Sequence, residues 1–77
     1  MSLPNDPIRP ELTQRECEIL RLISKGHDNR VVAETLGLTR GTVESHIHNI
    51  LRKLGAANRT EAVVIAIHQG LIDGDNS

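Results

Sequence analysis

The stretch DNRVVAETLGLTRGTVESHIHNILRKL, residues 28–54, holds two helical segments separated only by Gly37, Leu38 and Thr39. Glycine tolerates the left-handed conformation that ends a helix, and threonine is a preferred first cap of the next one. So short a connection brings two helices together at a steep angle. The stretch therefore predicts a helix-turn-helix, in which the second helix can enter a DNA major groove. Such corners also occur in ordinary helical bundles, so the spacing alone leaves a purely structural interpretation open.

The apolar spacing supports a helix in each half of this stretch. Asp28 is a suitable N-cap for a short helix with its apolar side chains on one face, and the next helix has apolar residues at i, i+4, i+7, i+8 and i+11. One side of each helix is therefore expected to face a core. The residues concerned are Val32, Ala33 and Leu36 in the first helix, and Val43, Ile47, Ile50, Leu51 and Leu54 in the second.

Two further helices are expected on either side. Thr13 and Glu16 have the spacing of a capping box, and Asn58 with Glu61 marks a second helix start near the carboxyl end. No segment alternates with period two, so no sheet is expected. We predict an all-α fold, a four-helix bundle containing a helix-turn-helix. Residues 12–72 form this domain, residues 1–11 are a linker or expression remnant, and residues 73–77 are a disordered tail.

Composition excludes several classes of protein. The 77 residues carry a net charge of −1, are 38% hydrophobic and include no aromatic side chain, which rules out single-stranded nucleic-acid binding by stacking on rings. No apolar run is long enough for a membrane span, and no signal peptide is recognisable, so a cytoplasmic protein is expected. The lone Cys17 cannot form an internal disulfide or a zinc cluster.

An enzyme is not expected either. The four histidines lack a metal-binding spacing, and Ser24, Ser45 and Cys17 lack the context of a catalytic nucleophile. The six glycines are scattered singly, so there is no phosphate-binding loop. We predict no catalytic residue, no metal and no cofactor.

Charge is distributed unevenly along the chain. Residues 29–59 carry five basic and two acidic residues, a local net of +3, whereas residues 1–28 sum to −1 and residues 60–77 to −3. A basic middle is expected where one face of a domain meets phosphates.

The polar side of the helix near residues 40–54 carries short hydrogen-bonding groups, with basic ones one to two turns later. Short groups suit base edges at close approach, and longer basic ones reach phosphates. A solvated face is the alternative, but such faces usually favour Glu and Lys pairs. Expected base contacts are Glu44, Ser45 and His48. Expected DNA-backbone contacts are Asn29, Arg30, Thr39, Arg40, Thr42, Asn49, Arg52 and Lys53.

Six short motifs follow one another along the chain: Leu12-Thr13-x-Arg15-Glu16, Gly26-x-x-Asn29, Ala33-x-x-Leu36-Gly37, Thr42-Val43-x-x-His46, Lys53-Leu54-Gly55 and Asn58-Arg59-Thr60-Glu61-Ala62. Together they resemble the LuxR-type helix-turn-helix domain of response regulators. The resemblance implies a four-helix domain that binds double-stranded DNA as a dimer and is attached to a sensory domain. Many members of the family have a basic residue where this chain has Glu44, and an acidic one where it has Val31, which is therefore expected to be an exposed apolar side chain.

Residues 62–67 of the last helix are apolar all round, although a helix on a small bundle needs only one buried stripe. We expect Ala62, Val63 and Ala66 to face inward with Leu71. The outward residues Val64, Ile65 and His68 then form a dimer interface, either in solution or only on DNA. A helical interaction module that contacts RNA polymerase or another regulator is the alternative function.

Two side chains keep open assignments. Arg59 either binds phosphate or pairs with Glu16. His46, at the edge of the apolar stripe, is either a structural histidine or a phosphate contact.

Overall fold

A computed structural model describes residues 12–73, so the predicted linker and all but the first residue of the predicted tail lie outside the described residues. Four helices follow in the order α1 (Gln14–Ser24), α2 (Asn29–Leu36), α3 (Arg40–Leu54) and α4 (Arg59–His68). No strand occurs within this range. The predicted all-helical fold is confirmed.

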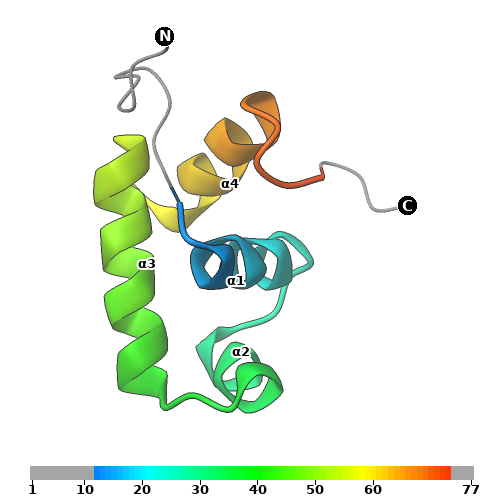
Figure 1. The fold of residues 1–77 in the computed structure, drawn as a ribbon, viewed down its shortest axis with the longest axis vertical. Coiled ribbons are helices and arrows are strands. Elements are labelled where there is room, and N and C mark those ends of the chain that lie inside the picture. The colour runs from blue at the N-terminus through cyan, green and yellow to red at the C-terminus, as the bar shows by residue number, and fades with distance from the viewer. Residues whose placement is uncertain (1–11, 74–77) are drawn as a thin grey trace, which may run out of the picture.

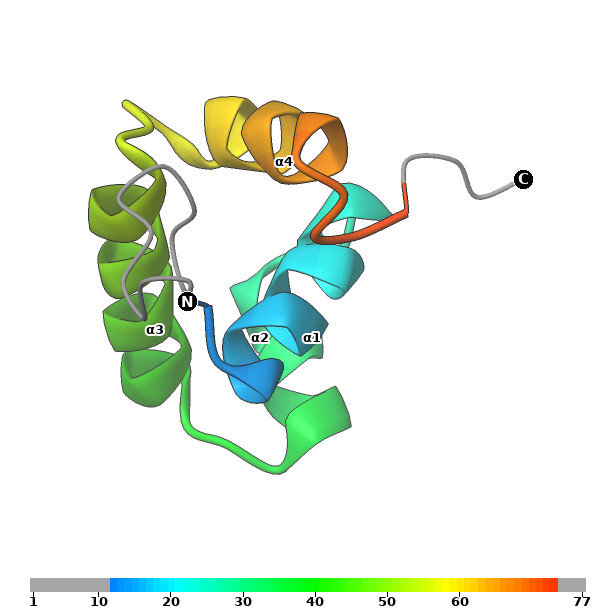
Figure 2. The same cartoon turned by 45° about the horizontal axis from the view of Figure 1, so that its top comes forward.

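The longest helix, α3, stands on one side of the molecule, and the other three helices lie together on its opposite side (Figures 1 and 2). Helix α1 packs against each of the others, and α3 packs against both α2 and α4. Because three helices support one side of α3, its opposite side is free to meet another molecule.

Each helix begins where the sequence predicts an N-cap. The hydroxyl of Thr13 accepts from the amide of Glu16 at 3.1 Å, and the Glu16 carboxylate accepts from the Thr13 amide at 2.9 Å, which completes the capping box. The side chain of Asp28 accepts from the Val31 amide at 3.0 Å, so α2 is capped in one direction only. Thr39 and Asn58 cap α3 and α4 in the same way.

The turn between α2 and α3 depends on Gly37, which has a φ of 71° and closes α2 in the left-handed region. Residues that carry a side chain rarely adopt this backbone conformation. Glycine therefore allows the chain to turn from α2 into α3 within three residues. The Leu38 amide donates to the Ala33 carbonyl at 2.8 Å and completes the helix end. The helix-turn-helix predicted from residues 28–54 is therefore present.

The core lies between the helices and consists of aliphatic side chains from all four of them. Ala62 and Ala66 of α4 are buried as expected, whereas Val63 and Leu71 are only half-buried. Ile72, which the sequence analysis did not assign to the core, is buried after the end of α4. The largest fully buried side chains are Ile19, Leu20, Val32, Val43 and Ile50.

Candidate nucleic-acid interface

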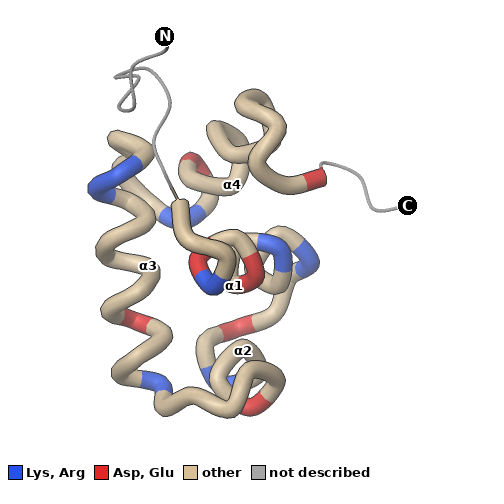
Figure 3. The backbone as a smooth tube through the Cα atoms, viewed as in Figure 1, with Lys and Arg blue, Asp and Glu red and all other residues tan. Residues whose placement is uncertain are grey.

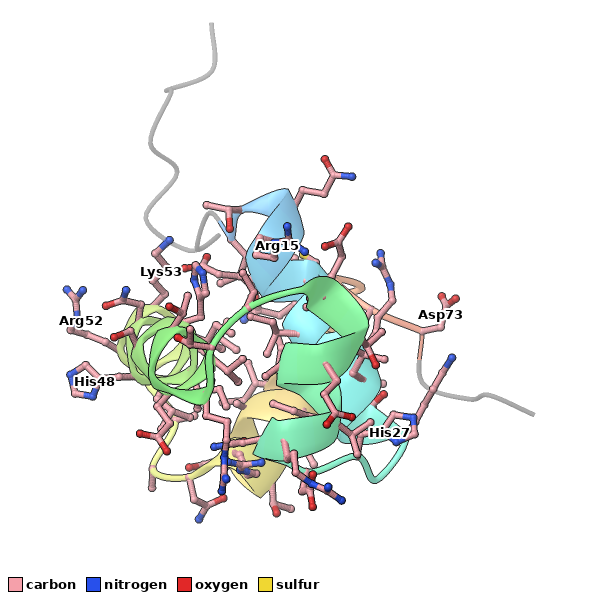
Figure 4. The ribbon with its side chains drawn as sticks, turned by 90° about the horizontal axis from the view of Figure 1, so that it is seen from below. Arg15, His27, His48, Arg52, Lys53 and Asp73 are labelled. Atoms are coloured by element: carbon pink, nitrogen blue, oxygen red, sulfur yellow. The ribbon has the colours of Figure 1, made fainter. Side chains whose placement is uncertain are left out.

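The exposed side of α3 carries the three predicted base-contact residues. Glu44, Ser45 and His48 are all exposed, while Val43 and Ile47 on the opposite side of the helix are buried. Viewed along its axis in Figure 4, α3 points His48 and Arg52 away from the rest of the molecule. The structure thus brings the predicted residues together on one accessible face.

Polar side chains beside this face are arranged by short-range hydrogen bonds. The Thr39 hydroxyl accepts from the amide of Thr42 at 3.1 Å and donates to the Thr42 hydroxyl at 2.9 Å. In the last turn of the helix, a guanidinium nitrogen of Arg52 donates to the side-chain oxygen of Asn49 at 3.1 Å. These bonds orient the side chains without burying them, so they remain able to meet a ligand.

Arg59 does not pair with Glu16, and this part of the sequence analysis is wrong. Its guanidinium donates instead to the side-chain oxygen of Asn29 at 2.9 Å, which joins the first residue of α4 to the first residue of α2. The two residues are 30 positions apart, so no local pattern indicated the contact. Asn29 is uncharged, so this bond does not neutralise the positive charge of Arg59. It places the guanidinium group next to the start of α2.

The partner of Glu16 is Lys53, in the last turn of α3. The Lys53 ammonium lies 2.9 Å and 3.2 Å from the two oxygens of a carboxylate whose side chain is only 5% exposed. Burial alone would raise the pKa of Glu16, but the hydrogen bond from the Thr13 amide and the positive charge of Lys53 outweigh it and lower the pKa. Lys53 therefore links α3 to α1, a role that its position on the predicted polar face did not indicate.

Arg30, near the start of α2, and Arg40, at the start of α3, are both exposed. With Asp28, Asn29 and Arg59 they line an open hollow of about 440 Å³ at the start of α2. The hydrogen bond from the Val31 amide lowers the pKa of Asp28, and the charges of Arg30 and Arg40 lower it further. The hollow combines one carboxylate with three guanidinium groups, so it is positively charged.

Other predicted features have mixed outcomes. Val31 is half-buried, whereas an exposed side chain was expected. His46 is half-buried as well, in agreement with its place at the edge of the apolar stripe. On α4, Val64 is 48% exposed, His68 is exposed and Ile65 is half-buried without packing against the core.

Basic residues lie at both ends of α3 and at the starts of α2 and α4, as Figure 3 shows. Together with the exposed polar side of α3 and the short turn at Gly37, this arrangement defines a helix-turn-helix DNA-binding domain. The family model described as "Bacterial regulatory proteins, luxR family" matches residues 10–66. The chain belongs to this LuxR family, as its short motifs suggested.

Named relatives agree with this family. The transcriptional regulatory protein DegU of Brevibacillus brevis is 44% identical over 61 residues, which are 79% of this chain and 26% of DegU. The response regulator protein VraR of Staphylococcus aureus is 48% identical over 61 residues, 79% of this chain and 29% of VraR. The chain thus spans less than a third of the length of either relative.

Solved structures show the same architecture. The transcription factor GerE has a TM-score of 0.80 and 31% sequence identity, and the match covers 83% of this chain and 96% of GerE. The VqmA dimer of Vibrio cholerae, a LuxR-type receptor, has a TM-score of 0.77 and 27% identity over 86% of this chain and 30% of VqmA. None of the helices between residues 12 and 73 is long and apolar enough to cross a membrane.

Proposed function

We propose that this chain binds double-stranded DNA sequence-specifically by inserting α3 into the major groove, as the effector domain of a longer bacterial transcription regulator. The observation that carries the proposal is the exposed polar face of α3, held outward by three supporting helices and flanked by basic residues at both ends. DegU and VraR are named as regulators and are longer than this chain, which supports a response regulator as the whole protein.

In this arrangement Glu44, Ser45 and His48 read base edges, because they are exposed on the part of α3 that would lie deepest in the groove. A carboxylate at position 44 can accept a hydrogen bond from the amino group of cytosine. The residues proposed for the DNA backbone are Asn29, Arg30, Thr39, Arg40, Thr42, Asn49 and Arg52, with Lys53 as a weaker member because Glu16 shares its charge.

The test is selection of binding sites from random double-stranded DNA, followed by titrations at several salt concentrations. A dimer that neutralises about 6–10 phosphates should lose on the order of a thousandfold in affinity between 50 and 200 mM salt. Ser45→Ala or His48→Ala should change the preferred base at one position per half-site, at a cost of about 1–3 kcal/mol on the best site.

A matched control is Arg21→Ala, which removes an exposed basic residue from the last turn of α1. This variant should keep the site preference and the salt slope of the parent. Affinity that is indifferent to salt would overturn DNA binding, and unchanged site preference in both α3 variants would overturn the proposed base contacts.

A second proposal concerns the outer face of α4, formed by Val64, Ile65 and His68. An exposed apolar patch on a small protein often marks an interface, and the structurally similar VqmA of Vibrio cholerae is a dimer. Two copies meeting on this face would favour inverted half-sites about one helical turn apart. Ile65→Glu should preserve the fold and abolish cooperative filling of paired half-sites. Cooperativity equal to that of the parent would overturn the dimer and favour another partner, such as RNA polymerase, for this face.

A further inference from the structure

The hollow lined by Arg30, Arg40 and Arg59 receives one arginine side chain from the first turn of each of three helices. Arg30 is the second residue of α2, Arg40 is the first residue of α3 and Arg59 is the first residue of α4. The three arginines come from positions up to 29 residues apart, and the tertiary structure brings them to one place. We call this site the three-arginine hollow.

These positions do not suit arginine as a structural residue. The amino end of a helix carries a partial positive charge, so a cation in the first turn is disfavoured there. Of the described residues that line the hollow, Asp28 alone is a carboxylate, and it accepts a hydrogen bond from the Val31 amide as the N-cap of α2. Within residues 12–73, no ion pair joins Asp28 to any of the three arginines. Three cations and one anion leave the hollow with two positive charges, which an anion from outside would balance.

We propose that the three-arginine hollow seats a single phosphate group of the DNA backbone, which the three arginines share. The inference rests on the proposed function and specifies one contact within it. The hydrogen bond from Arg59 to the side-chain oxygen of Asn29 holds Arg59 at the hollow, beside the other two arginines. Because that bond uses the oxygen of Asn29, its amide hydrogens remain as donors toward the same phosphate.

The proposal makes α4 part of the grip on DNA as well as part of the proposed dimer interface. Arg59 begins the helix whose outer face carries Val64 and Ile65. A phosphate in the hollow would therefore contact side chains from α2, α3 and α4 at once, beside the helix proposed to enter the groove.

The experiment uses a selected double-stranded site in which each phosphate in turn is replaced by an uncharged methylphosphonate. In the parent, substitution at each contacted phosphate should weaken binding by about tenfold, the size of one charge-assisted hydrogen bond, and one of these positions in each half-site should be the phosphate in the hollow. Arg30→Gln, Arg40→Gln and Arg59→Gln should each become less sensitive to substitution at one and the same position, and the triple variant should become insensitive there. Sensitivity lost at three different positions would overturn the shared site.

Salt titrations give an independent measure of the number of phosphates. Loss of one phosphate contact should lower the slope of log affinity against log salt by about 0.9 per protomer, and three separate contacts by about 2.7. The triple variant should therefore lose no more slope than one phosphate accounts for. A loss close to three phosphates would overturn the proposal while leaving DNA binding itself intact.

Two controls separate the possible failures. Asn29→Ala removes the hydrogen bond that holds Arg59 without changing the net charge. In this background the effects of Arg59→Gln and Arg40→Gln on DNA affinity should be independent of each other. Inorganic phosphate, compared with chloride at equal ionic strength, should displace DNA better from the parent but not from the triple variant. Equal displacement by the two anions in the parent would overturn a phosphate site in the hollow, whereas salt-independent binding of the parent would instead remove the proposed function.

Discussion

The two ends of α3 use basic residues in opposite ways. In the last turn, Lys53 lies 2.9 Å from the buried carboxylate of Glu16, and its ammonium holds α3 against α1. In the first turn, Arg40 joins two further arginines around a hollow where Asp28 is the one carboxylate. Lys53 is thus paired with a carboxylate of the same domain, whereas Arg40 lies on a surface with an excess of positive charge.

The helix macrodipole explains why the difference matters. A cation near the carboxyl end of a helix is stabilised by the partial negative charge there, and a cation near the amino end is destabilised. Lys53 therefore adds to the stability of the fold, whereas the dipole at the start of α3 opposes the charge of Arg40. We infer that the last turn of α3 stabilises the fold and that its first turn serves binding.

The largest effect is expected from Glu16→Ala, at the stabilising end. The substitution removes a buried carboxylate from both Lys53 and the amide of Thr13, and should lower the free energy of unfolding by about 2 kcal/mol. The loss is smaller than for a fully buried pair because the Lys53 side chain is 32% exposed. Urea unfolding followed by circular dichroism measures it.

Glu18→Ala is the matched control, since Glu18 lies on the same helix and pairs with Arg15 at 3.1 Å on the surface. Removing this exposed pair should change the free energy of unfolding by less than about 0.5 kcal/mol. Equal losses in the two variants would show that the buried pair does not stabilise α3 against α1.

The stability contributed by the pair of Glu16 and Lys53, at the carboxyl end of α3, should depend on pH. Because the folded state lowers the pKa of Glu16, its stabilising contribution is fully present above the ordinary pKa of an unfolded glutamate and is lost as the pH falls through the lower folded-state pKa. Glu16→Gln should therefore lose less stability on acidification than the parent. Some acid dependence should remain in this variant, since the pKa of Asp28 is lowered too. Parallel curves for parent and variant would contradict the assignment.

At the binding end, Gly41 offers a test in the opposite direction. It lies within the first turns of α3, and an added methyl group would meet only the Thr39 hydroxyl at 4.0 Å. Gly41→Ala should raise the free energy of unfolding by about 0.5–1 kcal/mol, because alanine loses less backbone entropy in a helix. Thermal unfolding without DNA provides the measurement. If Gly41→Ala is no more stable than the parent, the glycine at position 41 does not limit the stability of the first turn of α3.

The smallest effect is expected for Arg40→Gln, which removes a cation from the amino end of α3. This variant should gain about 0.3–1 kcal/mol in the free energy of unfolding at low salt, and the gain should shrink as salt screens the charge. Arg52→Gln, in the last turn of the same helix, should show no such gain. If Arg40→Gln is instead less stable than the parent, then Arg40 is a structural residue and the contrast between the two ends fails.

Local sequence signals predicted the helices accurately. The caps at Thr13, Asp28, Thr39 and Asn58 bond to amides only three residues away, so their effect does not depend on how the helices pack. The left-handed glycine at position 37 acts over a similarly short distance. For the same reason the exposed face of α3 could be identified from helical periodicity alone.

The candidate site was less predictable where its side chains interact over long distances. Lys53 and Glu16 are 37 residues apart, and both were assigned to other contacts from sequence. Arg59 was considered as a partner of Glu16 but bonds to Asn29, 30 residues away. Charge and residue type alone allow many such pairs, and only the helix crossings select among them.

The sequence by itself therefore determined the four helices, the turn at Gly37 and the polar face that α3 exposes, because caps, glycine stops and apolar spacing act within a few residues. Only the tertiary structure decided that Lys53 closes α3 onto α1, that Arg59 reaches Asn29, and that three arginines from three helix starts line one hollow. Those positions depend on the angles and distances at which the helices pack, which arise from the core as a whole.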